Sequence, residues 1–447
     1  MQASTGSMSR LVIPLRFFED LKKSLFRDEH ERCAVMFARS VRKENLLSRI
    51  VVFELMAIDD EWYDYRGPAG VQVKSELIAQ LAQRSRRTGD SIVLVHNHPF
   101  SFNQFSDTDD LGETRLEEFF TQRTPGIDHV SMLITPDTVI SRLLGKAQYL
   151  KTAVVGPVTQ FYWQGQTSVD ARYDRQVRIF GKAGQHVLGE LTIGIVGLGG
   201  TGSVVAQQLA HLGVNKFLLI DPDLIEQTNL NRVAGSTRRD IGLPKIDLAK
   251  RFITQINPDA RVSVIQDSVN KNTVAEFLAD TDLSFCCTDS HGSRAVINQL
   301  AYQYLLPVID MGVVISTHKG TIRDIAARTQ LLVPGLGCLV CGNILDPEQV
   351  RRDLLSDFER KSDPYIVDAD EPAPAVMSLN STIASLSVTM LLNCVLGMPG
   401  LARALTYNAI NGTVRHVVCP PQDTCVVCSE SGSLCKAHSW PLPGRKG

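Results

Sequence analysis

Residues 191–202 read Leu-Thr-Ile-Gly-Ile-Val-Gly-Leu-Gly-Gly-Thr-Gly, an apolar run that passes directly into a cluster of glycines. The run at 191–196 predicts a buried strand, and the cluster predicts a tight turn into a helix over 203–212. Glycines at such a turn bring backbone N–H groups close to a phosphate at the helix N-terminus. The stretch therefore predicts a nucleotide-binding unit, but its glycine spacing does not distinguish NAD, FAD and ATP.

Further apolar runs follow this unit at intervals typical of one sheet. They lie at 217–220, 262–265, 283–287 and 308–311 and alternate with helical segments. This alternation predicts an α/β fold with a parallel sheet and crossover helices. A longer apolar stretch at 379–396 is interrupted by Asn380 and three serines, so we expect a buried helix there rather than a membrane span.

The first third of the chain predicts a separate α/β domain. Residues 50–57 and 91–95 are predicted strands, and residues 75–87 are a predicted helix with apolar side chains on one face. Residues 156–171 have the weak periodicity of a linker. We therefore expect the domain boundaries at 1–155, 156–171, 172–420 and 421–447, the last being a tail rich in Ser, Gly and Pro.

The composition is that of a soluble globular protein. Hydrophobic residues make up 44% of the 447 residues and charged residues 21%, which excludes disordered and collagen-like classes. The 46 basic and 48 acidic side chains nearly cancel, so we expect neither nucleic acid nor a membrane as a partner. The N-terminal residues have no signal-peptide pattern, which predicts a cytoplasmic protein, and the ten cysteines then favour metal ligands or buried thiols over disulfides.

Two histidines lie at the end of the predicted strand 91–95. His96 and His98 share one face, because strand residues two apart point the same way. Ser106 and Asp109 have the spacing of a helix N-cap and its third-residue acid, and alone they predict only a capping box. Together, two imidazoles and one carboxylate predict a three-ligand zinc site with an open fourth position, the arrangement that hydrolyses amides.

The spacing of His96, His98, Ser106 and Asp109 resembles the JAMM (MPN/JAB) metalloprotease family, over roughly the first third of the chain. The resemblance implies an MPN-type α/β domain. In it His96, His98 and Asp109 would hold zinc, and Ser106 would donate to the tetrahedral intermediate.

The same resemblance implies an upstream glutamate as general base. Glu31, which precedes the apolar residues 33–37, is the candidate, and Glu29 is the second choice. A surface glutamate at a strand start is the alternative interpretation of either residue. His129 lies among apolar residues and is expected to be packed and hydrogen-bonded rather than a metal ligand.

Asp221 ends the second strand of the nucleotide-binding unit, where a ribose-binding acid would lie, so at this point an NAD site remains open. The polar residues that follow have no use in hydride transfer. In adenylation, Arg232 and Lys245 would neutralise the charge that develops on the α-phosphate, while Asp289 would hold magnesium. A lysine at the start of a helix is disfavoured by the helix dipole, so a phosphate explains Lys245 better than the helix does.

From Arg172 to Cys428 the order of these motifs resembles the ThiF/MoeB-type, ubiquitin-activating-enzyme-like adenylyltransferases. The resemblance implies a Rossmann-like parallel sheet that binds ATP and magnesium. The residues it assigns to the nucleotide are Gly197, Gly199, Gly200, Gly202, Asp221, Asn229, Asn231, Arg232, Lys245 and Asp289.

The motif Arg-Tyr-Asp-Arg-Gln at 172–176 opens this region. The resemblance implies that Arg175 reaches the nucleotide of a partner subunit, and hence a homodimer. The alternative interpretations are plain ones: Arg175 as a surface arginine, and Asn229 and Asn231 as turn residues.

Two Cys-x-x-Cys pairs, Cys338 with Cys341 and Cys425 with Cys428, predict a closed tetrahedral zinc site. Such a site would fasten the tail to the domain and stabilise it. Redox-active pairs or free thiols are the alternatives. Residues 351–376, where larger family members carry a catalytic cysteine, contain none, so we expect adenylation without an obligatory enzyme thioester.

The two resemblances together imply one pathway. The partner would be a ubiquitin-like or sulfur-carrier protein with C-terminal glycines, trimmed or removed by the first domain and adenylated by the second. A conjugating enzyme or a sulfur donor would be a further partner. The alternatives are a scaffold whose first domain only docks the modifier, and an NAD-linked oxidoreductase.

Overall fold

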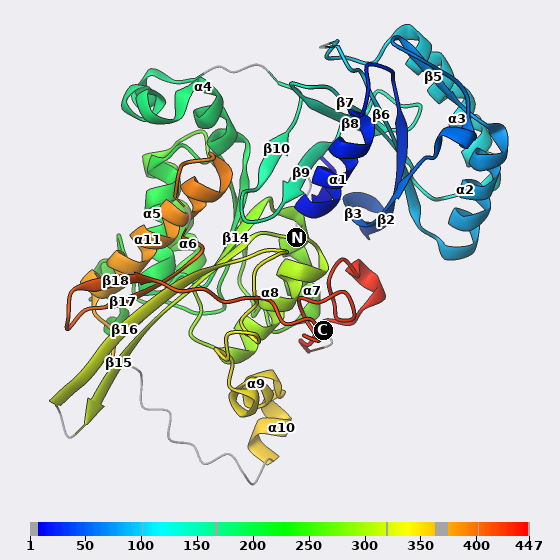
Figure 1. The fold of residues 1–447 in the computed structure, drawn as a ribbon. Helices are drawn as coiled ribbons and strands as arrows, with labels where there is room; N and C mark the ends of the chain where they lie inside the picture. The colour runs from blue at the N-terminus through cyan, green and yellow to red at the C-terminus, as the bar shows by residue number, and fades with distance from the viewer. Residues whose placement is uncertain are drawn as a thin grey trace. The chain divides into compact units, whose positions relative to one another are not determined.

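Two units make up the computed structural model, which describes residues 8–100, 102–165, 169–318, 321–362, 374–400 and 402–445. The first unit comprises residues 1–166 and 435–440, and the second comprises residues 167–434 and 441–447. Each unit is built around an eight-stranded sheet (Figure 1).

The sheet of the first unit is mixed. In spatial order its strands are β10 (Gln160–Tyr162), β9 (Lys151–Val155), β1 (Arg10–Pro14), β3 (Leu46–Ala57), β2 (Cys33–Lys43), β6 (Ser91–Asn97), β7 (Val130–Ile134) and β8 (Val139–Leu143). The strand β10 lies inside the segment predicted to be a linker. It pairs antiparallel with β9, and Tyr162 packs against Phe18, so tertiary contacts outweigh its weak local pattern.

Helices cover both faces of this sheet because alternate residues of its strands are apolar on both sides. Ala34, Met36 and Ala38 face the helix α1 (Leu15–Leu25), whereas Val35 and Phe37 face the opposite side. That opposite side is covered by α2 (Ser75–Thr88) and α3 (Asp107–Arg123). A small hairpin of β4 (Tyr63–Gly67) and β5 (Gly70–Val73) follows the 3-10 helix η1 (Asp60–Trp62).

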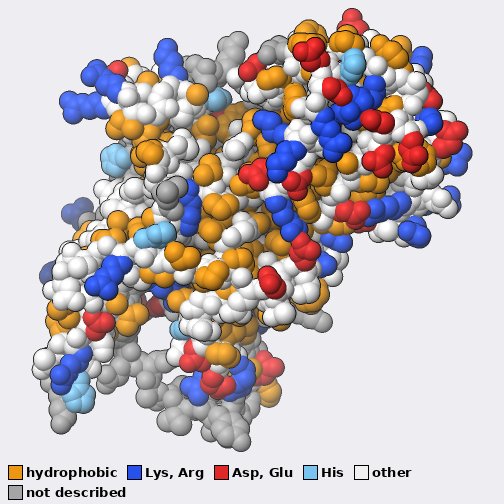
Figure 2. Space-filling view, viewed as in Figure 1, with side chains coloured by type: hydrophobic (Ala, Val, Ile, Leu, Met, Phe, Trp, Pro, Cys, Tyr) orange, Lys and Arg blue, Asp and Glu red, His pale blue; other side chains and the backbone are white. Residues whose placement is uncertain are grey.

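Residues 435–440 come from the end of the chain but belong to the first unit. The Nη1 of Arg39, on β2, donates to Cys435 O at 2.9 Å, and the 3-10 helix η6 (Ala437–Ser439) packs against the same strand. Ala437 and Cys435 are buried there. On the face of this unit that Figure 2 shows, basic and acidic side chains are interspersed, as expected from their nearly equal numbers.

The sheet of the second unit has a parallel half and an antiparallel half. Its strands, in spatial order, are β13 (Arg261–Ile265), β12 (Lys216–Ile220), β11 (Thr192–Val196), β14 (Leu283–Cys286), β15 (Val308–His318), β16 (Thr321–Leu332), β17 (Ala404–Asn408) and β18 (Thr413–His416). The strands from β13 to β15 are parallel, and the four from β15 to β18 pair antiparallel. The predicted apolar runs form the parallel half, which has the expected Rossmann-like order.

Helices of the second unit join and cover these strands. They are α4 (Asp174–Glu190), α5 (Gly200–His211), α6 (Lys245–Ile256), α7 (Asn272–Ala275), α8 (His291–Gln303), α9 (Pro347–Leu354), α10 (Asp357–Ser362) and α11 (Met377–Val395), with short 3-10 turns η2 (Ala171–Tyr173), η3 (Gln227–Asn229), η4 (Arg238–Asp240) and η5 (Glu276–Asp280). The crossovers through α5 and α8 carry the chain in opposite directions from the centre of the sheet. The carboxyl ends of β11 and β14 therefore meet at a topological switch point, where ligands bind in such sheets.

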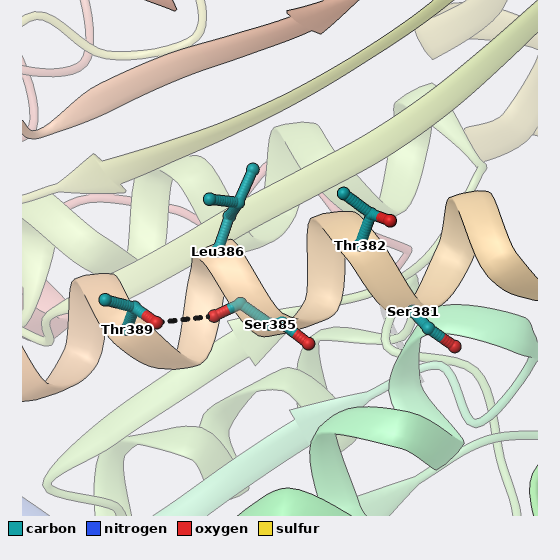
Figure 3. A pocket seen from close by; sticks show the side chains of 5 residues that line it. All are labelled: Ser381, Thr382, Ser385, Leu386 and Thr389. Carbon is teal, nitrogen blue, oxygen red and sulfur yellow. Dashed lines mark hydrogen bonds between the residues drawn. The ribbon is translucent and has the colours of Figure 1, made fainter. Parts of the chain in front are cut away.

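The predicted apolar helix is α11, which is long and apolar enough to cross a membrane by length and composition. It packs instead against α5, β15 and β16, and half of its apolar window is buried in the fold. Ser387 donates to Thr329 of β16 at 2.8 Å. The outer side of α11 carries a shallow pocket of about 410 Å³, lined by Ser381, Thr382, Ser385, Leu386 and Thr389 (Figure 3).

Candidate functional site

Strand β6 and helix α3 bring three of the predicted metal ligands together. The Oδ1 of Asp109, in the first turn of α3, lies 3.3 Å from His96 Nε2, and its Oδ2 lies 3.4 Å from His98 Nε2. The candidate ligand atoms of the three side chains all lie within 4.8 Å of one another. One ion of the size of zinc can therefore be reached by all three.

The Nε2 atom of each imidazole is directed at this cluster. His98 Nδ1 lies 2.9 Å from Phe102 O, and because a carbonyl only accepts, Nδ1 carries the proton and Nε2 remains available. His96 Nε2 is buried and makes no aligned hydrogen bond within the described residues. A buried nitrogen without a partner is unfavourable unless a ligand occupies the site. Two imidazoles and a carboxylate fit zinc.

The first turn of α3 is capped as predicted, and the cap also orients a ligand. Ser106 N and Oγ both donate to Asp109 Oδ2 at 2.7 Å, and Asp109 N donates to Ser106 Oγ at 3.2 Å. This capping box holds the carboxylate toward the two imidazoles. The structural and the metal-binding interpretations of Asp109 are thus compatible, while the Ser106 hydroxyl is engaged with Asp109 itself.

Glu31 is the glutamate that faces this cluster. It is 6% exposed, and its Oε1 lies 3.9 Å from His98 Nε2, whereas Glu29 is exposed. Burial raises the pKa of Glu31, and the nearby His98 and His96 oppose that shift. A buried carboxyl with a raised pKa beside potential metal ligands suits a group that takes up and returns a proton.

Burial raises the pKa of Asp109, but the close approach of His96 and His98 outweighs it and holds this pKa well below its usual range. The pKa of His98 shifts the other way. Burial lowers it, and the nearby Asp109 carboxylate and the hydrogen bond with Phe102 O raise it by more. Metal binding competes with this raised proton affinity, because a ligating imidazole nitrogen must be unprotonated.

Arg142 is a residue of this site that the sequence did not reveal as functional. It is buried on β8, where Nε donates to Glu113 Oε2 at 3.0 Å and Nη2 to Asp110 Oδ1 at 2.5 Å. Its guanidinium lies 3.8 Å from the ring centroid of Phe105, which packs against His96. An arginine inside the apolar run 139–143 was the only local signal.

His129 is a packed, hydrogen-bonded residue, as predicted. Its Nδ1 accepts from Ile92 N at 3.1 Å, and its Nε2 donates to Thr124 Oγ1 at 2.8 Å. Burial lowers the pKa of His129 to about 4. The neutral imidazole stabilises the fold through these two hydrogen bonds and lies outside the metal cluster.

In the second unit, the glycine turn joins β11 to α5. Gly197 has a φ of 87°, in the left-handed region that favours glycine. A Cβ on Gly202 would overlap Gly197 O, and a Cβ on Gly200 would overlap the side-chain amide of Asn380. A Cβ on Gly199 would meet nothing within 4 Å. The turn is thus tightly packed beneath and open above Gly199, at the N-terminus of α5.

Asp221 supports this turn from below. It is 4% exposed, its Oδ2 accepts from Leu198 N at 2.6 Å, and its Oδ1 accepts from Asp223 N at 2.8 Å. Burial raises the pKa of Asp221, and the charge of Lys245 opposes that shift. The carboxylate therefore ties the end of β12 to the glycine turn.

Lys245 begins α6, and its Nζ lies 2.7 Å from Asp223 Oδ2. A protein carboxylate thus already offsets the unfavourable position of this cation, for which the sequence favoured a phosphate. The Asp223 side chain is 60% exposed, so the pair is solvated and contributes little to stability.

The remaining predicted residues of the nucleotide site follow the carboxyl ends of β12 and β14, whereas Arg175 lies at the start of α4, where the neighbouring Gln176 donates to His211 O near the amino end of β12. Arg232 Nη1 donates to Thr228 O at 2.6 Å and to Asn231 Oδ1 at 3.3 Å, and its Cβ lies beside Gly200. Asn229 is buried and caps its own turn by accepting from Glu226 N at 3.1 Å. Asp289 is exposed in the loop after β14, and Arg175 is exposed in the first turn of α4.

The four predicted cysteines come together from two distant segments. Cys338 Sγ lies 3.8 Å from Cys341 Sγ and 3.6 Å from Cys425 Sγ, and Cys341 Sγ lies 3.4 Å from Cys428 Sγ. A hydrogen bond from Cys428 lowers the pKa of Cys338 to about 5. Four thiols at these distances indicate a structural zinc site with no open position. Cys419 lies beside this cluster, near Cys338 O.

Comparison with known proteins gives a match over the second unit. Residues 173–427 match the model of the ThiF family. The SAMP-activating enzyme E1 of Haloferax volcanii is 27% identical over 265 residues, which are 58% of this chain and 89% of that protein. The molybdopterin-synthase adenylyltransferase of Escherichia coli is 26% identical over 261 residues, 58% of this chain and 96% of that protein.

A shorter match is found with the sulfur carrier protein ThiS adenylyltransferase of E. coli, which is 33% identical over 140 residues, 31% of this chain and 56% of that protein. Among solved structures, E. coli MccB with ATP is similar with a TM-score of 0.46 and 23% identity. That alignment covers 59% of this chain and 76% of the MccB chain.

Proposed function

The chain belongs to the ThiF family, and we propose that its C-terminal unit adenylates the C-terminal glycine of a ubiquitin-like or sulfur-carrier protein. The unit is an ATP-dependent adenylyltransferase domain of the ThiF/MoeB type. Two of the similar proteins are named for activating SAMP or the sulfur carrier ThiS. The observation that carries the proposal is the glycine turn, open above Gly199 and flanked by Arg232 and by the Lys245–Asp223 pair.

In this proposal the phosphates of ATP bind the backbone N–H groups at the start of α5. Arg232 and Lys245 neutralise the charge that develops on the α-phosphate as the carboxylate of the carrier attacks it and pyrophosphate leaves. Asp289 holds magnesium, and Asp221 keeps the turn in place. Arg175 reaches the nucleotide of a second copy, so the active form is a homodimer.

Exchange of labelled pyrophosphate into ATP, in the presence of a diglycine-ending carrier, tests this activity. Lys245→Ala should reduce exchange by about 100-fold, since it removes a cation from the transition state. Lys271→Ala is the matched control, because Lys271 forms a comparable ion pair with Asp267 elsewhere in the same unit. Tight NAD binding with no exchange by the unaltered protein would refute the adenylation proposal.

We also propose that the N-terminal unit is a JAMM-type zinc peptidase or isopeptidase acting on the same modifier. The observation in favour is that Glu31, His96, His98 and Asp109 share one site. His96, His98 and Asp109 would hold zinc, which would polarise the scissile carbonyl and lower the pKa of a bound water. Glu31 accepts the proton at Oε1 and passes it to the leaving amine. Ser106 donates to the developing oxyanion when its hydroxyl turns from Asp109.

Zinc content distinguishes a peptidase from a docking domain that lacks activity. A full chain with both sites loaded should hold about two zinc ions, and His96→Ala should hold about one. Incubation with a carrier that carries a short C-terminal extension should release that extension, as seen in the intact mass of the carrier. One zinc ion in the unaltered chain, confined to the cysteines, would contradict the peptidase.

A further inference from the structure

The regular pairing of β6 with β2 ends next to the residue between the two histidines. Strand β6 lies between β2 and β7, and its last partner on β2 is Cys33, which lies opposite His96. Its pairing with β7 continues to Asn97, and His98 N donates to Ile134 O at 3.0 Å. The N–H of Arg32, just before β2, is therefore bonded to a side chain and not to a main-chain oxygen of β6.

The side chain that binds this N–H is that of Asn97. Its Oδ1 accepts from Arg32 N at 2.7 Å, while Asn97 N donates to Arg32 O at 3.2 Å. Its Nδ2 donates to Leu25 O at 3.1 Å, at the end of α1. Asn97 is fully buried, so these bonds are shielded from water. The side chain thus extends the pairing of β6 and β2 by one residue beyond the ladder.

The peptide group that Asn97 holds belongs to Glu31. The N–H of Arg32 and the carbonyl of Glu31 are parts of one planar unit. Asn97 Oδ1 binds its N–H, and Arg66 Nε donates to its carbonyl oxygen at 3.3 Å. Glu31 N donates in turn to Gly67 O at 2.8 Å. The backbone that carries the carboxyl is therefore fixed on both sides, with Glu31 Oε1 3.9 Å from His98 Nε2.

From this geometry we infer that Asn97 is a positioning residue, which keeps Glu31 in register with His96 and His98. The inference rests on the proposed peptidase function of the first unit. The Asn97 side chain is not one of the candidate metal ligands. It therefore positions the backbone of the proposed base, Glu31, and does not contact the metal. One residue links the strand that supplies two ligands to the segment that supplies the base.

The test compares two full-length variants that each remove a side-chain acceptor from a buried backbone N–H near β6. Asn97→Ala frees the N–H of Arg32, and His129→Ala frees the N–H of Ile92 at the other end of the strand. With an extended diglycine carrier as substrate, we expect Asn97→Ala to lower kcat by about 10- to 100-fold with KM and zinc content unchanged. His129→Ala should lower the melting temperature and retain kcat.

Equal losses of kcat in both variants, or an unchanged kcat in Asn97→Ala, would overturn the inference. A second readout does not depend on activity. Amide hydrogen exchange of peptides that cover residues 29–33 should accelerate in Asn97→Ala and not in His129→Ala. If the unaltered chain proves to be no peptidase, the proposed function fails, and this exchange measurement still decides whether Asn97 holds the Glu31 segment.

Discussion

Ser106 and Asp109 cap each other: the Ser106 hydroxyl donates to Asp109 Oδ2 at 2.7 Å, and Asp109 N returns a bond to Ser106 Oγ at 3.2 Å. The same carboxylate faces His96 and His98. A local device that starts a helix thus also fixes the rotamer of a candidate metal ligand.

Ser106→Ala should therefore affect both stability and metal binding. Loss of the cap is expected to cost about 1 kcal/mol of unfolding free energy. The freed carboxylate should also bind zinc more weakly. Ser290→Ala is a matched control, since Ser290 caps α8 by accepting from Ser293 N in the other unit. Zinc titration of both variants checks the prediction, and equal zinc affinities would contradict it.

Arg142→Met should weaken zinc binding by about 10- to 100-fold, because Arg142 anchors Asp110 and Glu113, which follow Asp109 in α3. Removing one partner of a buried ion pair also costs about 3–5 kcal/mol of unfolding free energy. The double variant Arg142→Met with Glu113→Gln should therefore be more stable than Arg142→Met alone, but it should still bind zinc weakly. Arg84→Met, which breaks the pair with Glu54, is the control and should bind zinc normally. A zinc-binding isotherm for each variant measures these affinities, and normal zinc binding by Arg142→Met would contradict the prediction.

Stability of the first unit should decrease as the pH falls from about 6.5 to 4. Burial lowers the folded-state pKa of His129 to about 4 from the 6.5 that is usual for histidine, so the unfolded chain binds more protons in this window. The contribution, roughly 3 kcal/mol, is present above pH 6.5 and is lost as the pH falls toward 4. Urea unfolding at pH 7 and pH 5 checks this. His129→Gln should show a smaller difference between the two pH values.

Gly202→Ala and Gly199→Ala should separate folding from nucleotide binding. A Cβ at Gly202 overlaps Gly197 O, so this variant should lose about 1–3 kcal/mol of stability. A Cβ at Gly199 meets no protein atom within 4 Å, so this variant should keep its melting temperature and bind ATP more weakly. Calorimetric titration with ATP and thermal unfolding measure the two effects. Unchanged ATP affinity in Gly199→Ala would contradict phosphate binding at this turn.

Cys338→Ser should release one zinc ion and destabilise the second unit, because structural zinc contributes directly to folding. Cys419→Ser is the control, since Cys419 lies beside the cluster without being one of its four thiols. Metal analysis and thermal unfolding of both variants provide the readout. Retention of zinc by Cys338→Ser would contradict the four-thiol site.

Local patterns predicted much of the fold and the candidate ligands. The alternation of apolar runs and helices predicted the parallel sheet. The spacing of His96, His98 and Asp109 predicted the cluster, because these residues lie at the end of one strand and in the first turn of the helix that follows it. Asn97 and Arg142 were missed because their roles depend on partners 65 and 32 residues away. The ion pair of Lys245 with Asp223 was missed for the same reason, because the two residues are 22 positions apart in the sequence and meet only in the folded chain.

The segment at 435–440 makes the first unit discontinuous in sequence. It follows residues 167–434 of the second unit but completes the packing of β2 through the bond from Arg39 to Cys435 O. A fragment that ends at residue 166 would therefore leave part of β2 without the residues that cover it. Excision of the first unit for separate study has to retain residues 435–440 as well as the first 166 residues.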